Sequence, residues 1–316
     1  MSIAILGAGA FGTALAMALS RDGETVALWS RDAADARTMD AERKTGRHLP
    51  GLDLPDGVTI AFDVPTADIT LVAVPAQSVR GFLDEHKAAL SGRTVITCAK
   101  GVERGTGFGP IDVIRAVLPN ARAGCLTGPS FAVDIAVGLP TALVLAMEEG
   151  AAEVQGILTR PALRIYRTDD VAGAQLGGAL KNIIAIAAGI AIGAGLGDSA
   201  RASVIARGFA EMSRYARLKG AETETVQGLS GLGDLVLTCT SEKSRNFSAG
   251  LLFGQGKAPD AATTVEGIAT AQAVAAEASA LGIDMPLSTA IAAVTEGKLD
   301  ISTAIETLLA RPAGKE

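Results

Sequence analysis

A glycine-rich turn directly behind the first apolar segment restricts the fold of this chain more than any other feature. The short apolar run Ile3–Leu6 is followed by Gly7-Ala8-Gly9-Ala10-Phe11-Gly12 and then by a helix-like stretch rich in Ala, Leu and Met. Gly-x-Gly-x-x-Gly between a strand and a helix is typical of Rossmann domains, which bind dinucleotides. Gly7 would permit the tight turn, Gly9 the approach of the backbone to the pyrophosphate, and Gly12 the close packing of the helix. The chain is therefore predicted to begin with a dinucleotide-binding unit.

Strand-like and helix-like segments alternate in the first half of the chain. We expect strands at 25–29, 69–74, 94–98, 141–147 and 164–168, helices at 13–19, 79–90 and 109–117, and a loop over 42–57. Near-continuous apolar strands that alternate with helices indicate a parallel sheet covered on both faces. Long alanine-rich helices follow at 175–193, 200–218, 266–281 and 288–296. The prediction is an α/β protein: a doubly wound, mostly parallel Rossmann sheet over 1–168, then an all-α domain over 169–316 with a frayed tail at 311–316.

The composition argues against several classes of function. Hydrophobic residues make up 48% of the 316 residues and charged residues 20%, so we expect a large core. A net charge of −6 and an aromatic content of 3% argue against binding of nucleic acid or of an anionic membrane surface. No signal peptide is recognised, and the apolar stretch 182–197 falls short of the roughly 20 residues of a membrane span. We expect a cytoplasmic protein in which this stretch is a buried core helix.

The cysteines and histidines do not indicate a metal site. Cys98, Cys125 and Cys239 lie in or beside apolar runs without Cys-x-x-Cys spacing, so buried reduced thiols are expected. His48 and His86 are the two histidines of the chain, too few to support a His-built zinc site or a catalytic triad. Acid–base chemistry would have to use other groups.

The end of the second expected strand bears on the choice of cofactor. NAD enzymes usually place Asp or Glu there to bind the ribose 2′-hydroxyl, whereas Arg accommodates the 2′-phosphate of NADP. The chain reads Trp29-Ser30-Arg31-Asp32 at this point. Arg31 therefore favours NADP and Asp32 keeps NAD open. The alternative is that Arg31 is a solvated surface charge.

Two lysines are notable because of their apolar surroundings. Lys100 follows the strand at 94–98, at the edge of the sheet where Rossmann ligands bind, although an ordinary lysine with its head in solvent fits the same position. Lys181 lies within the most apolar helix. Burial lowers the pKa of an amine toward neutrality, which suits an acid–base catalyst. The alternative is that Lys181 lies on an exposed edge of that helix.

Two polar clusters interrupt apolar sequence in the second half. Gly231-Leu-Gly-Asp234 is expected to be a turn that presents one carboxylate. Ser244-Arg245-Asn246 gathers three donors suited to phosphate oxygens. Either cluster could instead be a helix cap or a solvated loop.

These segments together resemble the bacterial NAD(P)-dependent glycerol-3-phosphate dehydrogenases over almost the whole chain. Seven blocks follow the order of the family, at 7–16, 98–101, 128–132, 175–182, 231–240, 244–246 and 265–267. The family often has Trp or Tyr at position 11, where Phe11 keeps an aromatic ring. The resemblance implies reversible reduction of dihydroxyacetone phosphate to sn-glycerol 3-phosphate with NADP(H) or NAD(H), NADP favoured. This reaction would feed glycerophospholipid synthesis.

The resemblance also implies roles for individual residues. Lys181 matches the proton acceptor of the family, and Lys100 and Asp234 are the other expected catalytic residues. The residues implied in substrate binding are Lys100, Gly128, Ser130, Lys181, Asn182, Asp234, Ser244, Arg245 and Asn246. Those implied in cofactor binding are Gly7, Gly9, Ala10, Phe11, Gly12, Arg31, His48, Lys100, Ala132, Arg245, Thr264 and Glu266. A small phosphorylated triose is the expected partner, no metal or nucleic acid is expected, and the oligomeric state is left open, with a homodimer as one option.

Two other functions stay compatible with the sequence. A 2-hydroxyacid or sugar-acid dehydrogenase could use the same lysines for a carboxylate substrate, and the cluster at 244–246 argues against it because that cluster suits phosphate. A dinucleotide-sensing regulator would need a partner surface and no buried lysine, so a buried Lys181 argues against that function.

Overall fold

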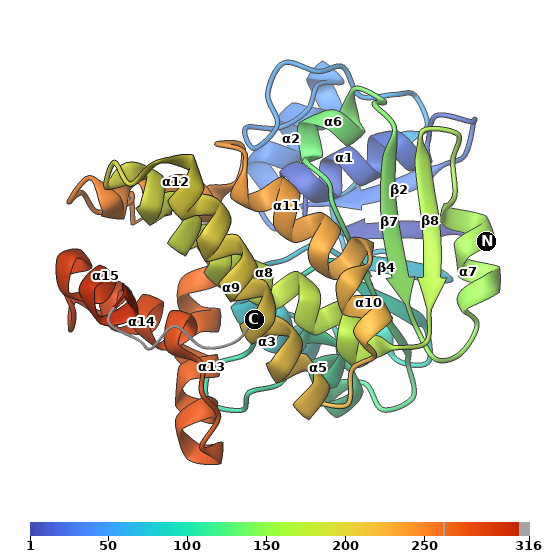
Figure 1. Cartoon of the computed structure of the whole chain (residues 1–316). Helices are drawn as coiled ribbons and strands as arrows, with labels where there is room; N and C mark the ends of the chain where they lie inside the picture. The colour runs from blue at the N-terminus through green and yellow to red at the C-terminus, as the bar shows by residue number, and fades with distance from the viewer. Residues whose placement is uncertain (262, 310–316) are drawn as a thin grey trace.

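The computed structural model describes residues 1–261 and 263–309, so the tail expected at 311–316 lies outside the described residues. An eight-stranded sheet with helices against its faces forms the first half, and a group of helices beside it forms the second (Figure 1). The predicted fold class, a Rossmann sheet followed by a helical part, is confirmed.

The strands of the sheet lie in the order β3-β2-β1-β4-β5-β6-β7-β8. Their bounds are β1 Ile3–Leu6, β2 Val26–Trp29, β3 Val58–Ala61, β4 Ile69–Val72, β5 Thr94–Thr97, β6 Arg122–Thr127, β7 Thr141–Ala146 and β8 Leu163–Thr168. Every pairing is parallel except that between β6 and β7. The chain order reverses at β1, which has β2 on one side and β4 on the other. In sheets of this type the ligand binds where the order reverses, at the carboxyl ends of the strands.

Two strands, β3 and β6, were not predicted. β3 is a short strand at one edge of the sheet and directly follows the loop expected at 42–57. β6 begins with Arg-Ala-Gly, which has little strand propensity. Gly124 packs closely there, because an added Cβ would lie 3.1 Å from the carbonyl oxygen of Ala146 on the neighbouring strand. Pairing with β5 and β7, rather than local sequence, makes this segment a strand.

Helices cover both faces of the sheet. They are α1 Ala10–Leu19, α2 Ala33–Glu42, α3 Val79–Glu85, α4 Lys87–Leu90, α5 Pro110–Val117, α6 Ala132–Ala136 and α7 Ala151–Leu158. One apolar core includes Leu15, Leu28 and Leu71, and the core on the other face includes Leu83 and Ile114. The helix predicted over 79–90 is divided at His86 into α3 and α4.

The second half of the chain packs around one central helix, α8 (Figure 1). Its helices are α8 Val171–Gly193, α9 Gly197–Leu218, α10 Thr223–Gln227, α11 Asp234–Cys239, α12 Arg245–Gly254, α13 Glu266–Leu281, α14 Pro286–Thr295 and α15 Ile301–Leu309, with a π-helical turn at Leu229–Gly233. α8 begins eleven residues before the expected apolar stretch 182–197, and as a whole it is long and apolar enough to cross a membrane. The prediction of a buried core helix is confirmed, because 89% of its apolar window is buried within the protein.

α8 and α12 are in contact through their backbones. A Cβ on Gly189 of α8 would overlap the carbonyl oxygen of Phe247, and a Cβ on Gly250 of α12 would overlap that of Ile186. Small residues at such positions let two helices approach closely. The close crossing brings the first residues of α12 toward Lys181 in the middle of α8.

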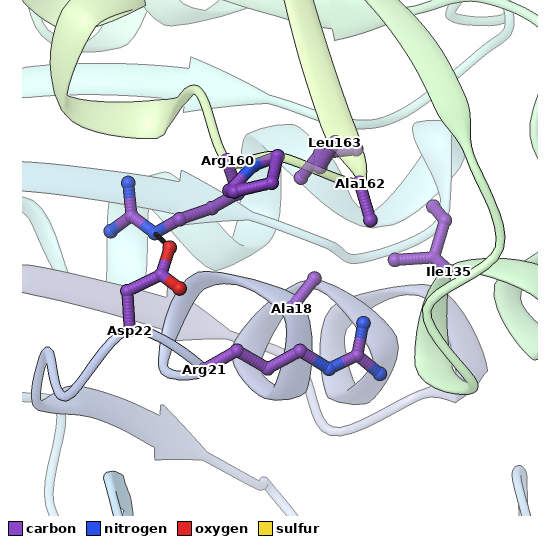
Figure 2. A pocket seen from close by; sticks show the side chains of 8 residues that line it. Ala18, Arg21, Asp22, Ile135, Arg160, Ala162 and Leu163 are labelled. Carbon is purple, nitrogen blue, oxygen red and sulfur yellow. Dashed lines mark ion pairs between the residues drawn. The ribbon is translucent and has the colours of Figure 1, made fainter.

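A cavity of about 100 Å³ lies beside the C-terminal end of α1 (Figure 2). Arg160 donates to the carbonyl oxygen of Leu19 over 3.1 Å and lies 3.6 Å from the carboxylate of Asp22. Arg21 donates to the carbonyl oxygen of Ala136. These arginines join the end of α1 to neighbouring segments. The glycine turn lies at the other end of α1.

Candidate active site

The glycine turn joins β1 to the N-terminal end of α1. Gly7 has φ +119°, and an added Cβ would lie 2.7 Å from the carbonyl oxygen of Ala73. A Cβ on Gly12 would overlap the carbonyl oxygen of Gly7, whereas a Cβ on Gly9 would meet no atom within 4 Å. Gly7 and Gly12 are thus required by close packing, and Gly9 faces open space. No side chain caps the first N–H groups of α1. This end of the helix can therefore receive an anionic group such as a pyrophosphate.

The carboxyl end of β2 carries Arg31 and Asp32, the residues expected to contact the ribose of the cofactor. Arg31 is exposed and forms no hydrogen bond or ion pair with the described residues. Asp32 caps α2 by accepting hydrogen bonds from the N–H groups of Ala34 and Asp35, at 3.0 and 3.1 Å. The bond from Asp35, together with that from Ala34 and the charge of Arg47, holds the pKa of Asp32 below its ordinary value although desolvation opposes this.

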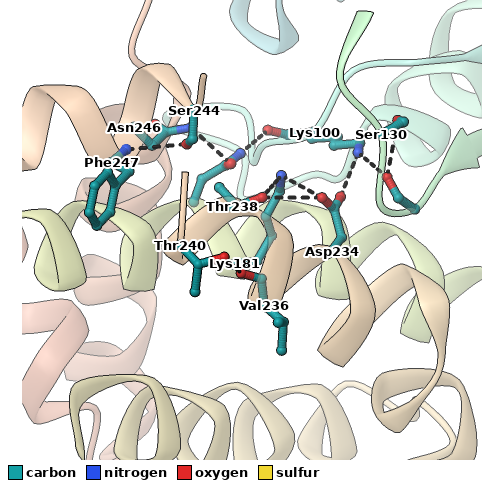
Figure 3. A network of polar contacts seen from close by, with 12 residues as sticks. Lys100, Ser130, Lys181, Asp234, Val236, Thr238, Thr240, Ser244, Asn246 and Phe247 are labelled. Atoms are coloured by element: carbon teal, nitrogen blue, oxygen red, sulfur yellow. Dashed lines mark hydrogen bonds and ion pairs between the residues drawn. The ribbon is translucent and has the colours of Figure 1, made fainter. Parts of the chain in front are cut away.

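The central polar cluster joins both halves of the chain on one carboxylate, that of Asp234 (Figure 3). Lys100, just after β5, donates to Oδ2 of Asp234 over 2.5 Å and to the carbonyl oxygen of Gly128 over 3.0 Å. Lys181 of α8 donates to Oδ1 of Asp234 over 2.9 Å and to Oγ1 of Thr238 over 2.7 Å. The Lys181 side chain is 9% exposed and that of Asp234 is 2% exposed. Lys181 is therefore not on an exposed helix edge.

Burial and charge shift the pKa values of this cluster. Burial lowers the pKa of Lys181 to about 8, because desolvation and the charge of Lys100 outweigh the opposing effect of Asp234. Burial alone would raise the pKa of Asp234, but the two lysines outweigh it and hold that pKa below its ordinary value. The cluster thus holds a permanent carboxylate beside an amine that can gain or lose a proton near neutral pH.

The segment around Asp234 is helical, so the prediction of a turn at 231–234 was wrong. The π-helical turn Leu229–Gly233 runs directly into α11. Gly231 is needed because an added Cβ would overlap the carbonyl oxygen of Val226. Thr238, which sequence reasoning missed, follows Asp234 by four residues and therefore lies on the same helix face. Helical spacing would have identified it if the segment had been read as a helix.

A chain of amide hydrogen bonds connects Lys100 with the start of α13. Asn182 donates to the carbonyl oxygen of Lys100 over 3.0 Å, and Asn246 donates to Oδ1 of Asn182 over 2.9 Å. The N–H of Gly267 in turn donates to Oδ1 of Asn246 over 2.9 Å. Figure 3 shows Asn246 at the far end of the same polar network as Lys100. Asn182 and Asn246 therefore hold α8, α12 and α13 against the carboxyl end of β5.

Ser244 and Arg245 lie at the start of α12. Ser244 caps the helix by accepting from the N–H of Phe247 over 3.2 Å, so the helix-cap alternative for this residue is correct. Arg245 is the first residue of α12, is exposed, and forms no hydrogen bond or ion pair with the described residues. The start of α12 is joined to the residue after Lys181 by the hydrogen bond from Asn246 to Asn182, and the charge of Arg245 acts on Glu266.

The other expected residues lie around this cluster and along the same edge of the sheet. Glu266, at the start of α13, accepts a hydrogen bond from the N–H of Ala76 over 3.1 Å and so joins the two halves. Burial raises the pKa of Glu266, although the bond from Ala76 and the charge of Arg245 oppose this.

Ser130 donates to the carbonyl oxygen of Gly128 over 3.3 Å. Ala10 begins α1, half-buried Phe11 packs against the core, Ala132 begins α6, and Thr264 is exposed just before α13.

Thr127, at the end of β6, has a buried hydroxyl with no hydrogen-bond partner. A Cβ on Gly178 of α8 would lie 2.7 Å from this hydroxyl and 3.5 Å from Cγ of Lys100. Glycine at 178 therefore lets α8 pack directly on the end of β6 and on the stem of Lys100.

The cysteines are free, as expected. Burial raises the pKa of each thiol to about 12. Among residues 1–261 and 263–309, no group of His, Cys, Asp and Glu side chains could hold a metal ion.

Two family profiles match the chain. The profile described as NAD-dependent glycerol-3-phosphate dehydrogenase N-terminus matches residues 2–153, and the C-terminus profile of the same family matches residues 170–306. The chain belongs to the NAD-dependent glycerol-3-phosphate dehydrogenase family. This membership decides against the two alternatives that the sequence left open.

Relatives within the glycerol-3-phosphate dehydrogenase family align over the full length. Proteins named glycerol-3-phosphate dehydrogenase [NAD(P)+] from Roseobacter denitrificans and Paracoccus denitrificans are 54% and 55% identical to it, each over 100% of both chains. The crystal structure of glycerol-3-phosphate dehydrogenase from Coxiella burnetii superimposes with a TM-score of 0.92, at 35% identity and over 98% of this chain and 99% of that one. The chain thus has both parts of the family's architecture.

Proposed function

We propose that this member of the glycerol-3-phosphate dehydrogenase family reversibly reduces dihydroxyacetone phosphate to sn-glycerol 3-phosphate with NADPH or NADH, NADPH being preferred. The observation that supports this most is the convergence of Lys100 and Lys181 on the buried carboxylate of Asp234, next to the N-terminus of α12. Lysines from both halves of the chain meet there, so the predicted cofactor-binding part and the helical part both contribute charged groups to one place.

The nicotinamide cofactor supplies or accepts the hydride when it is bound. Gly7, Gly9 and Gly12 fit its pyrophosphate, because Gly9 leaves open space at an uncapped helix N-terminus. Arg31 and Glu266 would bind the cofactor at two other points of its site. Arg31 lies at the end of β2, and Glu266 connects α13 to the main chain after β4.

Lys181 transfers the proton. In reduction its protonated amine donates a proton to the oxygen on C2 of the substrate, and in oxidation its neutral amine takes that proton back. A pKa of about 8 makes both forms accessible near neutral pH. Lys100 and Asp234 orient the substrate oxygen and the amine, and Thr238 accepts one N–H of Lys181 so that the remaining proton has a defined direction.

The N-terminus of α12 binds the substrate phosphate. Arg245 is free to form a bidentate contact with phosphate oxygens, and the helix N-terminus stabilises negative charge at the same place. Ser244 and Asn246 add polar groups on either side of Arg245. This set also explains how a protein of net charge −6 can bind an anionic substrate.

We further propose a boundary between a dinucleotide-binding domain at 1–168 and a substrate domain at 169–316. The last strand ends at Thr168 and α8 begins at Val171, which supports this division. A cytoplasmic enzyme whose product feeds glycerophospholipid synthesis is the proposed setting. A homodimer is the proposed assembly, which light scattering of the purified protein would test.

A single assay tests the proposed activity. The purified chain is mixed with dihydroxyacetone phosphate and NADPH, with NADH in parallel, and the loss of reduced cofactor is followed by absorbance. Turnover is expected with both cofactors and faster with NADPH at low concentration. Absence of turnover with either cofactor, in protein that binds NADPH, would contradict the proposed reaction.

A further inference from the structure

A second arginine lies at the end of β2, beside the position of Arg31. Arg47 comes from the loop that follows α2, and its Nη2 atom lies 3.0 Å from Oδ2 of Asp32. Nε of the same guanidinium donates to Nε2 of His48 over 3.4 Å. Arg31 and Asp32 are neighbours in sequence, so the end of β2 carries one free and one loosely paired arginine. The motifs of the sequence pointed to Arg31 and His48 but not to Arg47.

The backbone that carries Arg47 is held in place. Thr45 and Leu52 close the loop through a hydrogen bond of 2.9 Å from the N–H of Thr45. An added Cβ on Gly46 would lie 2.7 Å from a carboxylate oxygen of Asp35, so the loop packs closely against the first turn of α2. The guanidinium of Arg47 is thus presented to the end of β2 by an ordered loop.

The ion pair between Arg47 and Asp32 is exposed and can exchange. The Arg47 side chain is 64% exposed and that of Asp32 is 38% exposed. Exposed pairs contribute little to stability, so Arg47 can leave Asp32 at small cost when a stronger anion is present. Asp32 cannot move away in the same manner, because two N–H groups of α2 hold its other carboxylate oxygen.

Asp32 has opposite consequences for the two cofactors. It follows Gly12 by about 20 residues, the spacing at which a Rossmann carboxylate accepts the ribose 2′-hydroxyl of NADH. The 2′-phosphate of NADPH would instead bring about two further negative charges next to this immobile carboxylate. Arg31 alone would not neutralise the combined negative charge of Asp32 and the 2′-phosphate. A second cation is needed there, and Arg47 is the arginine already bound to Asp32.

We propose that Arg47 is a specificity-determining residue, which shares the 2′-phosphate of NADPH with Arg31 and stays on Asp32 when NADH is bound. The exchange lets one site accept both cofactors. The inference rests on the proposed function, since it concerns the cofactor of the same reaction.

The test measures the Kd of NADPH and of NADH for the full-length chain by nucleotide fluorescence. Arg47→Ala is expected to raise the Kd of NADPH by about 10- to 100-fold, as for a lost charge-assisted hydrogen bond, and to change that of NADH by less than about twofold. Arg47→Lys keeps the charge without the planar fork and is expected to fall between the two. Adenosine 2′,5′-bisphosphate should displace NADPH from the wild type at lower concentration than AMP does, and this advantage should be lost in Arg47→Ala.

Lys44→Ala is the matched control. Lys44 lies on the same loop and forms an exposed ion pair with Asp53 over 3.3 Å, so its loss removes a similar charge and pair at another place. Both Kd values should stay at their wild-type level in this variant. An unchanged Kd of NADPH in Arg47→Ala, or an equal rise for both cofactors, would overturn the inference, the second result indicating a structural role. A wild type that binds neither dinucleotide would contradict the proposed function itself.

Discussion

The proposed cofactor side and the proposed substrate side of the site are built in different ways. On the cofactor side, six consecutive residues, 7–12, make the glycine turn, and the charged groups at the end of β2 are exposed. On the substrate side, Lys100, Lys181 and Asp234 come from three distant segments and are largely buried. The first side depends on local backbone geometry, and the second on how helices pack.

This difference in burial determines how firmly the charged groups are held by their partners. Exposed ion pairs such as that of Asp32 and Arg47 are screened by water and can exchange between partners. The buried carboxylate of Asp234 and its two lysines hold one another, because each would be costly to leave unpaired away from water. The exposed pair thus suits the proposed recognition of two cofactors, and the buried cluster suits the fixed positioning of the proposed reaction centre.

Lys181→Met should cause the largest loss of turnover and should leave cofactor binding intact. Removal of the proposed proton donor is expected to lower kcat by about 10²- to 10⁴-fold, the usual contribution of a positioned acid–base group. Asp234 keeps Lys100 as a partner, so the fold should survive and the Kd of NADPH should change little. Both quantities are measured on one preparation. A near-normal kcat would move the proton transfer to Lys100.

Arg245→Ala should weaken substrate binding while leaving the proton-transfer groups in place. The KM for dihydroxyacetone phosphate is expected to rise by about 10- to 100-fold, or about 1.4–2.7 kcal/mol, the size of a lost charge-assisted hydrogen bond. Steady-state kinetics at saturating NADPH measure this. Dihydroxyacetone without the phosphate should be a very poor substrate of the wild type, and efficient turnover of it would count against a phosphate site at α12.

Arg31→Ala should affect the cofactor side alone. NADPH binding is expected to weaken by about 1.5–3 kcal/mol and NADH binding to stay nearly constant, because only NADPH carries the 2′-phosphate. Fluorescence titration with both cofactors provides the comparison. Equal losses for the two cofactors would remove Arg31 from 2′-phosphate recognition.

Gly250→Ala tests whether helix packing builds the substrate side. The added Cβ would overlap the carbonyl oxygen of Ile186, so a loss of about 1–3 kcal/mol in the free energy of unfolding is expected. Gly156→Ala in α7 is the control, since a Cβ there would meet nothing within 4 Å. It should stabilise the protein by about 0.4–1 kcal/mol. Urea unfolding of both variants measures the difference, and equal stabilities would show that the close crossing is not required.

The pH dependence of kcat is expected to be the smallest effect and the one most specific to Lys181. The pKa of Lys181 is lowered to about 8, so half of its amine is unprotonated at that pH. The kcat for reduction should fall as the pH rises through about 8, because reduction needs the protonated amine, and the kcat for oxidation should rise. The residual activity of Lys181→Met should lack this transition. A transition that persists in this variant would belong to another group.

The longest and most apolar elements of the fold were accessible from the sequence, and several shorter ones were not. The helix at 266–281 agrees with α13, and the expected strands at 69–74 and 94–98 contain β4 and β5. β6 and the helical turn before Asp234 were missed because both contain glycines, which weaken a local strand or helix signal. Gly124 lies close to the backbone of Ala146 on a neighbouring strand, and Gly231 lies close to the carbonyl oxygen of Val226 five residues before it. Neither close approach is encoded in local propensity.

The sequence by itself determined the Rossmann turn, the change from alternating strands and helices to long helices, and the two lysines in apolar segments. These features depend on residues that are neighbours in the chain or on periodic patterns of hydrophobicity. Only the tertiary structure decided that both lysines meet on Asp234, that Thr238 contacts Lys181 and that Arg47 reaches Asp32. The physical reason is that each of these contacts joins segments far apart in sequence, through helix crossings and loop closure that no local pattern specifies.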